Sequence, residues 1–267
     1  MEARSKPNCT KEAFMRLFNW ISRGIAVVAM LVTVGSAKAA SYTFNGSSGS
    51  LSARATFVTG GGQLVITLRN NSTADALVPT DILTAIFFDT DPNTVLTPVS
   101  AVLGSGSTVL FQSQPVGGVV GGEWSYAHDI TSAPLSNPEQ GTSSTGLGLF
   151  SPSGNFPGPN LQGPVSVDGL QYGITSAGDN TSTGNSAVTG GFALIKDTVV
   201  FTFNAVPDSF TISNVRFLYG TSTSGPIIPG TGGSDTPPPV PDGGSTLLLL
   251  GSALVGFSIL RRKISAA

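Results

Sequence analysis

Alternating apolar and polar residues dominate the middle of the chain and predict short β-strands. Apolar residues alternate with polar ones over Leu51–Phe57 and again over Leu64–Leu68, with Gly60–Gly62 between the two runs. This pattern predicts a β-hairpin with one face exposed to water. The segment Ile82–Phe88 is apolar at both alternating sets of positions. We therefore expect it to form a central strand that is covered on both sides.

The second half of the chain continues the same strand pattern. Apolar residues alternate over Thr198–Asn204, and the apolar phase shifts by one residue between Phe210–Ile212 and Val215–Tyr219, which predicts a bulge or turn at Asn214. Shorter candidate strands are Val95–Leu103, Thr108–Phe111, Glu123–Ala127 and Leu170–Thr175. Many short strands separated by Gly, Pro, Asn and Ser predict an all-β ectodomain over residues 40–219, an antiparallel β-sandwich or jelly-roll-like fold.

Two segments interrupt the strand pattern. Ser132–Pro164 contains six prolines together with many Gly and Ser residues. Such a long loop is uncommon inside a compact domain, so we expect a functional or mobile segment there. Residues 220–239 are rich in Gly, Ser, Thr and Pro, and we predict a linker without regular structure.

The first 39 residues have the three parts of a secretory signal peptide. Five basic residues precede the uninterrupted apolar run Gly24–Gly35, and Ala37 and Ala39 provide the small residues that a signal peptidase requires. Twelve residues are too few to span the hydrocarbon core of a bilayer. We therefore predict export through the Sec translocon and cleavage by signal peptidase, with an uncleaved N-terminal anchor as the alternative.

The C-terminus has a second three-part signal, at residues 240–263. It begins with a short motif, continues with an uncharged aliphatic segment that predicts a transmembrane helix over residues 246–260, and ends in a basic cluster that should stay in the cytoplasm. The motif residues are Val240, Pro241, Asp242, Gly243 and Gly244, and the basic residues are Arg261, Arg262 and Lys263. A plain tail anchor is the alternative, in which the membrane is the only partner.

This arrangement resembles the PEP-CTERM sorting signal of Gram-negative bacteria, in a Val-Pro-Asp-Gly-Gly variant. The resemblance implies that an exosortase, an integral-membrane transpeptidase-like enzyme, cuts near the motif and releases or re-attaches the protein outside the membrane. Physical features of the motif fit this role. Pro241 holds Val240 extended, and Gly243-Gly244 disfavours a helix, so the backbone is accessible to a peptidase.

The charge distribution excludes several classes of protein. Only 10% of the residues are charged, against about 25% in an ordinary domain. Between residues 40 and 244, thirteen acidic residues face four basic ones, a net charge of −9. Such a chain should not bind nucleic acid. Cys9 lies in the predicted signal peptide and His128 is the only histidine, so we expect no disulfide, no zinc site and no cofactor.

Trp124 and Tyr126 are the candidates for glycan binding. They lie two residues apart on one strand face, which suits either the core of a sandwich or a platform that stacks on sugars. The acidic residues around them, Glu123, Asp129 and Glu139, could provide the carboxylate pair of a glycoside hydrolase. Acids are spread along the whole chain, however, so the core interpretation is preferred.

The sequence offers weaker signals for two further sites, a catalytic triad and a calcium loop. His128 and Asp129 could belong to a Ser/His/Asp triad, but the chain has no Gly-x-Ser-x-Gly elbow. Asp89, Asp91 and Asn93 place oxygen ligands at alternate positions, as calcium loops do. They lack the remaining EF-hand positions, and Asp-Pro-Asn is first of all a turn after a buried strand.

Together these observations predict an exported, exosortase-processed surface or matrix protein with a non-enzymatic structural or adhesive role. Residues 81–89, 122–126 and 169–175 also resemble segments of exosortase-dependent surface proteins. A carbohydrate-binding module of an exopolysaccharide biofilm matrix is the first alternative, and a secreted glycoside hydrolase is the second.

Overall fold

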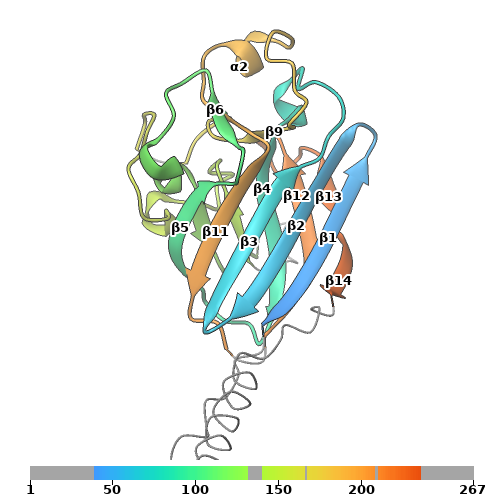
Figure 1. Ribbon diagram of the computed structural model, residues 1–267, viewed down its shortest axis with the longest axis vertical. Helices are drawn as coiled ribbons and strands as arrows, with labels where there is room; N and C mark the ends of the chain where they lie inside the picture. The colour runs from blue at the N-terminus through green and yellow to red at the C-terminus, as the bar shows by residue number, and fades with distance from the viewer. Residues whose placement is uncertain (1–38, 132–139, 166, 208–209, 236–267) are drawn as a thin grey trace, which may run out of the picture. The chain divides into compact units, whose positions relative to one another are not determined.

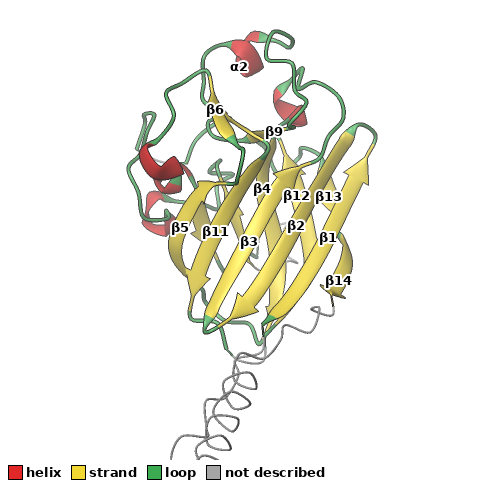
Figure 2. Cartoon of the chain, in the orientation of Figure 1, coloured by secondary structure: helices red, strands yellow, loops and turns green. Residues whose placement is uncertain are grey.

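A computed structural model describes residues 39–131, 140–165, 167–207 and 210–235 of the chain. Two β-sheets pack face to face as a sandwich (Figures 1 and 2). The described residues belong to one compact unit. Within the described ranges no helix is long and apolar enough to cross a membrane, and the predicted helix 246–260 lies outside them.

The first sheet has six strands, all of them paired antiparallel. Their order is β14 (Thr231–Asp235), β1 (Ala40–Ser48), β2 (Leu51–Gly60), β3 (Gln63–Asn70), β11 (Thr198–Asn204) and β5 (Thr97–Leu103). The predicted hairpin is confirmed as β2 and β3, joined at Gly61 and Gly62. The inner face of the hairpin buries apolar side chains such as Phe57 and Ile66, whereas the outer face carries mostly polar side chains together with Val58 and Val65.

The second sheet has eight strands. Six follow the order β13 (Ile227–Pro229), β12 (Thr211–Tyr219), β4 (Leu83–Asp91), β9 (Ile174–Thr175), β10 (Leu194–Lys196) and β6 (Thr108–Leu110), while β7 (Ser125–Ala127) and β8 (Gln140–Ser143) extend it from β4. The central position of β4 confirms the prediction for Ile82–Phe88. Strands β9 and β10 run parallel, so the sandwich is not purely antiparallel.

Short helical turns occupy the connections. Among the described residues they are four 3₁₀ turns, η1 (Pro79–Asp81), η2 (Val116–Gly118), η3 (Gly121–Glu123) and η4 (Pro152–Gly154), and one α-helical turn, α2 (Ser186–Thr189). None of them covers a face of either sheet as a layer (Figure 2).

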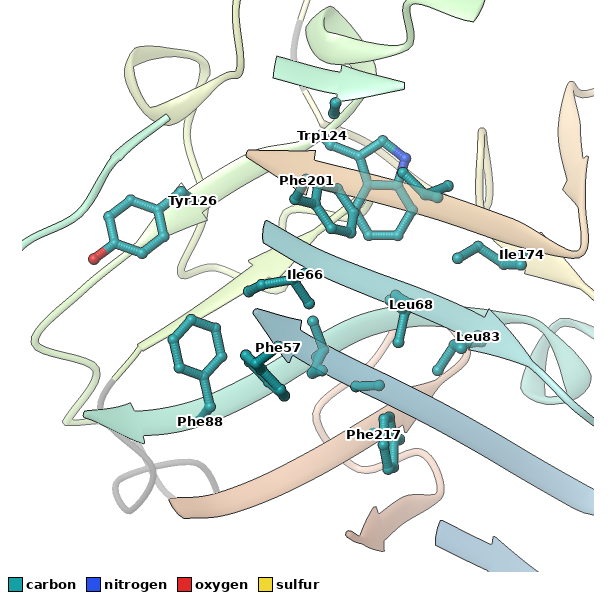
Figure 3. Packing of buried hydrophobic residues seen from close by; sticks show 14 of the residues in the cluster. Phe57, Ile66, Leu68, Leu83, Phe88, Trp124, Tyr126, Ile174, Phe201 and Phe217 are labelled. Carbon is teal, nitrogen blue, oxygen red and sulfur yellow. The ribbon is translucent and has the colours of Figure 1, made fainter. Parts of the chain in front are cut away.

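The core lies between the two sheets and is rich in aromatic side chains (Figure 3). Phe57 of the first sheet meets Phe44 and Phe88 edge to face, with ring centroids 5.8 and 5.3 Å apart. All three rings are buried. Packing of this kind must stabilise the exported domain without disulfides, because residues 40–267 contain no cysteine.

The phase shift at Asn214 is confirmed as an irregularity of β12. The register against β4 shifts between Ser213 and Arg216, and Asn214 has a φ of +50°. The extra residue returns apolar side chains to the inner face on both sides of the shift.

The prediction of an unstructured linker over residues 220–239 was wrong for residues 227–235, which form two strands. Strand β13 pairs with β12 in the second sheet, and β14, after Gly230, pairs with β1 in the first. This segment therefore passes from one sheet to the other and closes one side of the sandwich. Backbone pairing with β1 holds β14 in place although β14 has no apolar side chain to bury.

The segment Ser132–Pro164 is also more ordered than its composition predicts. Residues 132–139 lie outside the described part, but β8 pairs with β4 and β7, and Phe150 and Phe156 are buried. The first and last described strands of the domain meet at one pole of the sandwich, because Ser41 of β1 pairs with Asp235 of β14. The loop that carries α2 lies at the opposite pole (Figure 1).

Candidate functional site

A cavity of about 460 Å³ opens beside β5 and β7, next to the 3₁₀ turn η4. Its apolar lining comes from residues 95–98 and from Leu149. Its polar lining is formed by the side chains of Tyr126, His128, Ser151, Ser153 and Asn155. Lys and Arg are absent from this lining. The cavity therefore suits a neutral, hydroxyl-rich ligand better than an anion.

Tyr126 is held rigidly at the inner wall of this cavity. Its hydroxyl donates to Oε1 of Gln140 at 2.8 Å and accepts from the backbone N–H of Leu96 at 3.1 Å. The ring lies edge-on to Phe203 and 6.1 Å from the His128 ring. Burial raises the pKa of Tyr126 to about 12, and the nearby charge of Asp129 adds to this effect. The phenol is therefore a neutral hydrogen-bonding group at physiological pH.

Trp124 lies in the core and does not line the cavity. Its side chain is fully buried and packs on Phe201 with ring centroids 5.0 Å apart (Figure 3). For Trp124, the interpretation as a residue of the sandwich core, preferred from the sequence, therefore holds. Of the two candidate glycan-binding residues, only Tyr126 lines this cavity.

His128 and Asp129 form an exposed pair at the rim. Nδ1 of His128 is 2.8 Å from Oδ2 of Asp129. Ser151 and Ser153 line the same cavity, but their hydroxyls bond to each other at 2.7 Å. Within the described residues, no serine hydroxyl hydrogen-bonds to the His128 ring, so this arrangement lacks the nucleophile–base contact of a triad.

The two carboxyl groups predicted as a glycosidase pair differ in burial: Asp129 is exposed at the rim of the cavity, whereas Glu123 is buried. Glu123 is 2% exposed, and its Oε1 accepts hydrogen bonds from the N–H groups of Leu161 and Gln162. Burial raises the pKa of Glu123, the two backbone hydrogen bonds partly offset this, and the negative charge of Asp168 raises it further. The carboxylate next to Glu123 is thus Asp168, which the sequence did not single out. Glu139, the third candidate, lies outside the described residues.

The candidate calcium residues have protein partners. Oδ2 of Asp89 accepts from Nδ2 of Asn214, and Oδ1 of Asn93 accepts from Nε2 of Gln140. Asp91 is exposed at the end of β4. In the part of the chain that the structure describes, no three His, Cys, Asp or Glu side chains gather as a metal site. The turn interpretation accounts for these contacts.

Sequence reasoning missed the residue that connects this region. Gln140 is fully buried, and its Nε2 donates to Oγ1 of Thr90 at 2.6 Å and to the backbone oxygen of Thr94 at 3.2 Å. The amide therefore ties β4 and the following turn to Tyr126. Its position within the proline-rich segment Ser132–Pro164 offered no periodic signal from which this role could be predicted.

The terminal signals lie mostly outside the described residues. This applies to Ala37, to the motif Val240–Gly244 and to the basic cluster Arg261–Lys263, while Ala39 is described and exposed.

No curated protein and no solved structure matches the chain. A family model described as the VPDSG-CTERM motif matches residues 239–264. Asp242 agrees with the motif, and Gly243 stands at its serine position. The chain therefore carries a PEP-CTERM-like exosortase sorting signal at its C-terminus, which implies an exported, exosortase-processed surface protein.

Proposed function

We propose that the chain is a non-enzymatic structural or adhesive protein of the cell surface or extracellular matrix of a Gram-negative bacterium. The match to the sorting motif at residues 239–264 carries this proposal. A signal peptide over residues 1–39 brings the chain to the translocon, and a helix over residues 246–260 holds it in the membrane until the exosortase acts. The net charge of −9 over residues 40–244 suits a hydrated extracellular surface.

The geometry of the sandwich supports a tethered role. Strand β14 ends opposite Ser41 at one pole, so the sorting tail leaves the domain there. The long loops around α2 lie at the other pole (Figure 1). A domain held by its C-terminal tail would thus present these loops away from the point of attachment.

Mass spectrometry of the mature C-terminus tests the sorting step. We expect a product that ends near Val240–Gly244 when the chain is expressed in a host with an exosortase. A double substitution, Pro241→Ala with Asp242→Ala, should leave the full-length form in the membrane fraction. Pro238→Ala, just before the matched residues, is the control and should be processed normally. An intact C-terminus on the surface-exposed wild type would show simple anchoring instead.

Binding of a neutral saccharide in the cavity is the second candidate function. The observation that favours it is the cavity of about 460 Å³ beside Tyr126 and His128, with serine hydroxyls on its wall. Ser153→Trp should fill this space and abolish retention on the matching polysaccharide, whereas Ser224→Trp, at an exposed position away from the cavity, should not. Retention that survives Ser153→Trp would exclude the cavity. Trp124→Ala is unsuitable as a test because it removes core packing.

A further inference from the structure

Two buried side chains, Glu123 and Gln171, hydrogen-bond to the loop at residues 161–163, outside the cavity described above. Glu123 binds the N–H of Gln162 at 2.9 Å and the N–H of Leu161 through Oε1. Gln171, which is 7% exposed, donates from Nε2 to the backbone oxygen of Gly163 at 3.5 Å. The carboxylate and the amide therefore reach consecutive residues of one loop.

Asp168 belongs to the same neighbourhood. Its negative charge contributes to the raised pKa of Glu123, and burial raises the pKa of Asp168 as well. Oδ1 of Asp168 and Oε1 of Gln171 are both inaccessible to solvent, and neither accepts a hydrogen bond within the described residues. Buried polar atoms in folded proteins nearly always have a partner, so two unpartnered acceptors three residues apart in the chain require an explanation.

A cation explains this arrangement better than a donor group does. All three unpaired or partly paired groups are oxygen acceptors, and two of them are carboxyl groups that lose hydration on burial. A bound water could donate to the acceptors, but it would not neutralise two carboxylates. Carboxylate and amide oxygens are the ligands that Ca²⁺ takes, at six to eight positions that water helps to fill.

We propose that the carboxylate of Glu123, Oδ1 of Asp168 and Oε1 of Gln171 bind a Ca²⁺ ion that fastens the loop at residues 161–163 to the sandwich. The site has only two carboxylates, which agrees with the absence of any cluster of three His, Cys, Asp or Glu side chains among the described residues. With so few charged ligands, the affinity should fall in the range of extracellular calcium modules, about 0.1–1 mM. Such a site would be filled outside the cell.

Terbium luminescence on the full chain, purified in detergent and stripped with a chelator, tests the site directly. Trp124 follows Glu123 in the chain and can sensitise a bound Tb³⁺ ion. We expect Tb³⁺ emission on excitation of tryptophan, displaced by Ca²⁺ at about 0.1–1 mM. Ca²⁺ at ten times its dissociation constant should raise Tm by about 3–6 °C. Mg²⁺ should have a smaller effect, because it demands a more regular octahedral site.

Three variants separate this site from non-specific binding of cations to an acidic protein. Asp168→Asn should lose the Tb³⁺ signal and the calcium-dependent shift, whereas Gln171→Glu, which adds a third carboxylate, should lower the calcium midpoint about tenfold or more. Asp129→Asn removes an exposed acid and is the control, with an unchanged midpoint. The proposal is overturned if the wild type shows no calcium-displaceable emission, or if Gln171→Glu and Asp168→Asn behave as the control does.

Discussion

The hydroxyl of Tyr126 donates a 2.8 Å hydrogen bond to Oε1 of Gln140, and both side chains are buried behind the cavity. Through its Nε2 atom, Gln140 also bonds to Thr90 and Asn93. One amide thus joins the end of β4, the turn after it and the strand β7. The shape of the cavity wall depends on this junction.

Gln140→Leu should destabilise the domain more than its small change in volume suggests. The substitution leaves the Tyr126 hydroxyl without its acceptor in a buried environment, which costs about 1–3 kcal/mol. Urea unfolding of residues 40–238 measures the change. Gln63→Leu is the matched control, since Gln63 bonds to Asn204 on the exposed surface, and it should change stability by less than about 0.5 kcal/mol. Equal effects would mean that the buried network contributes nothing.

The strands that bury apolar side chains could be predicted, and those held by backbone pairing could not. Alternation revealed the hairpin of β2 and β3, and the phase shift in β12 marked Asn214 correctly. Strand β8, with the sequence Gln-Gly-Thr-Ser, is buried at every position yet has no apolar residue. Its side chains are satisfied by partners distant in sequence, such as Ser143 Oγ on the backbone oxygen of Thr84. Such partners are visible only once the fold is known.

The candidate site could likewise be predicted only where its signal is local in the sequence. The pattern around Trp124 and Tyr126 located the strand, but burial assigned one ring to the core and the other to the cavity wall. The acidic neighbour of Glu123 is Asp168, 45 positions further along the chain. No spacing rule connects a residue of the 3₁₀ turn η3 with one in an irregular loop at that separation. The terminal sorting signal, in contrast, is local in sequence and was identified from its residues alone.

Phe57→Ala should cost about 3–5 kcal/mol of unfolding free energy, the range for loss of a large buried aromatic residue. Phe57 is fully buried between Phe44 and Phe88. Phe192→Ala removes the same number of atoms from a residue that is 45% exposed and should cost much less. Urea unfolding of both variants measures the difference. A similar loss in the two variants would contradict the assignment of Phe57 to the centre of the core.

Stability should fall as the pH rises through the pKa of Glu123. Burial places that pKa above its ordinary value of 4.5, so the folded state binds more protons than the unfolded state in this range. The contribution of Glu123 is therefore fully present below pH 4.5 and is lost as the pH rises through the folded-state pKa. In chelator, the wild type should therefore lose stability relative to Glu123→Gln as the pH rises from 4.5 towards neutrality. Denaturation midpoints along this pH series measure the difference, and parallel profiles would contradict it.

Gly232→Ala should detach β14, the strand that leads into the sorting tail. Gly232 has a φ of +146°, and a Cβ atom there would lie 2.0 Å from the backbone oxygen of Thr43 on β1. The variant must therefore distort or break the pairing, at a cost of about 1–3 kcal/mol. Gly233→Ala is a control in the same strand, because a Cβ atom at that position meets nothing within 4 Å. Limited proteolysis should cut the Gly232 variant near residue 230 and spare the control. Equal protection of both variants would show that β14 tolerates a side chain at Gly232 and that the pairing with β1 is looser than its register indicates.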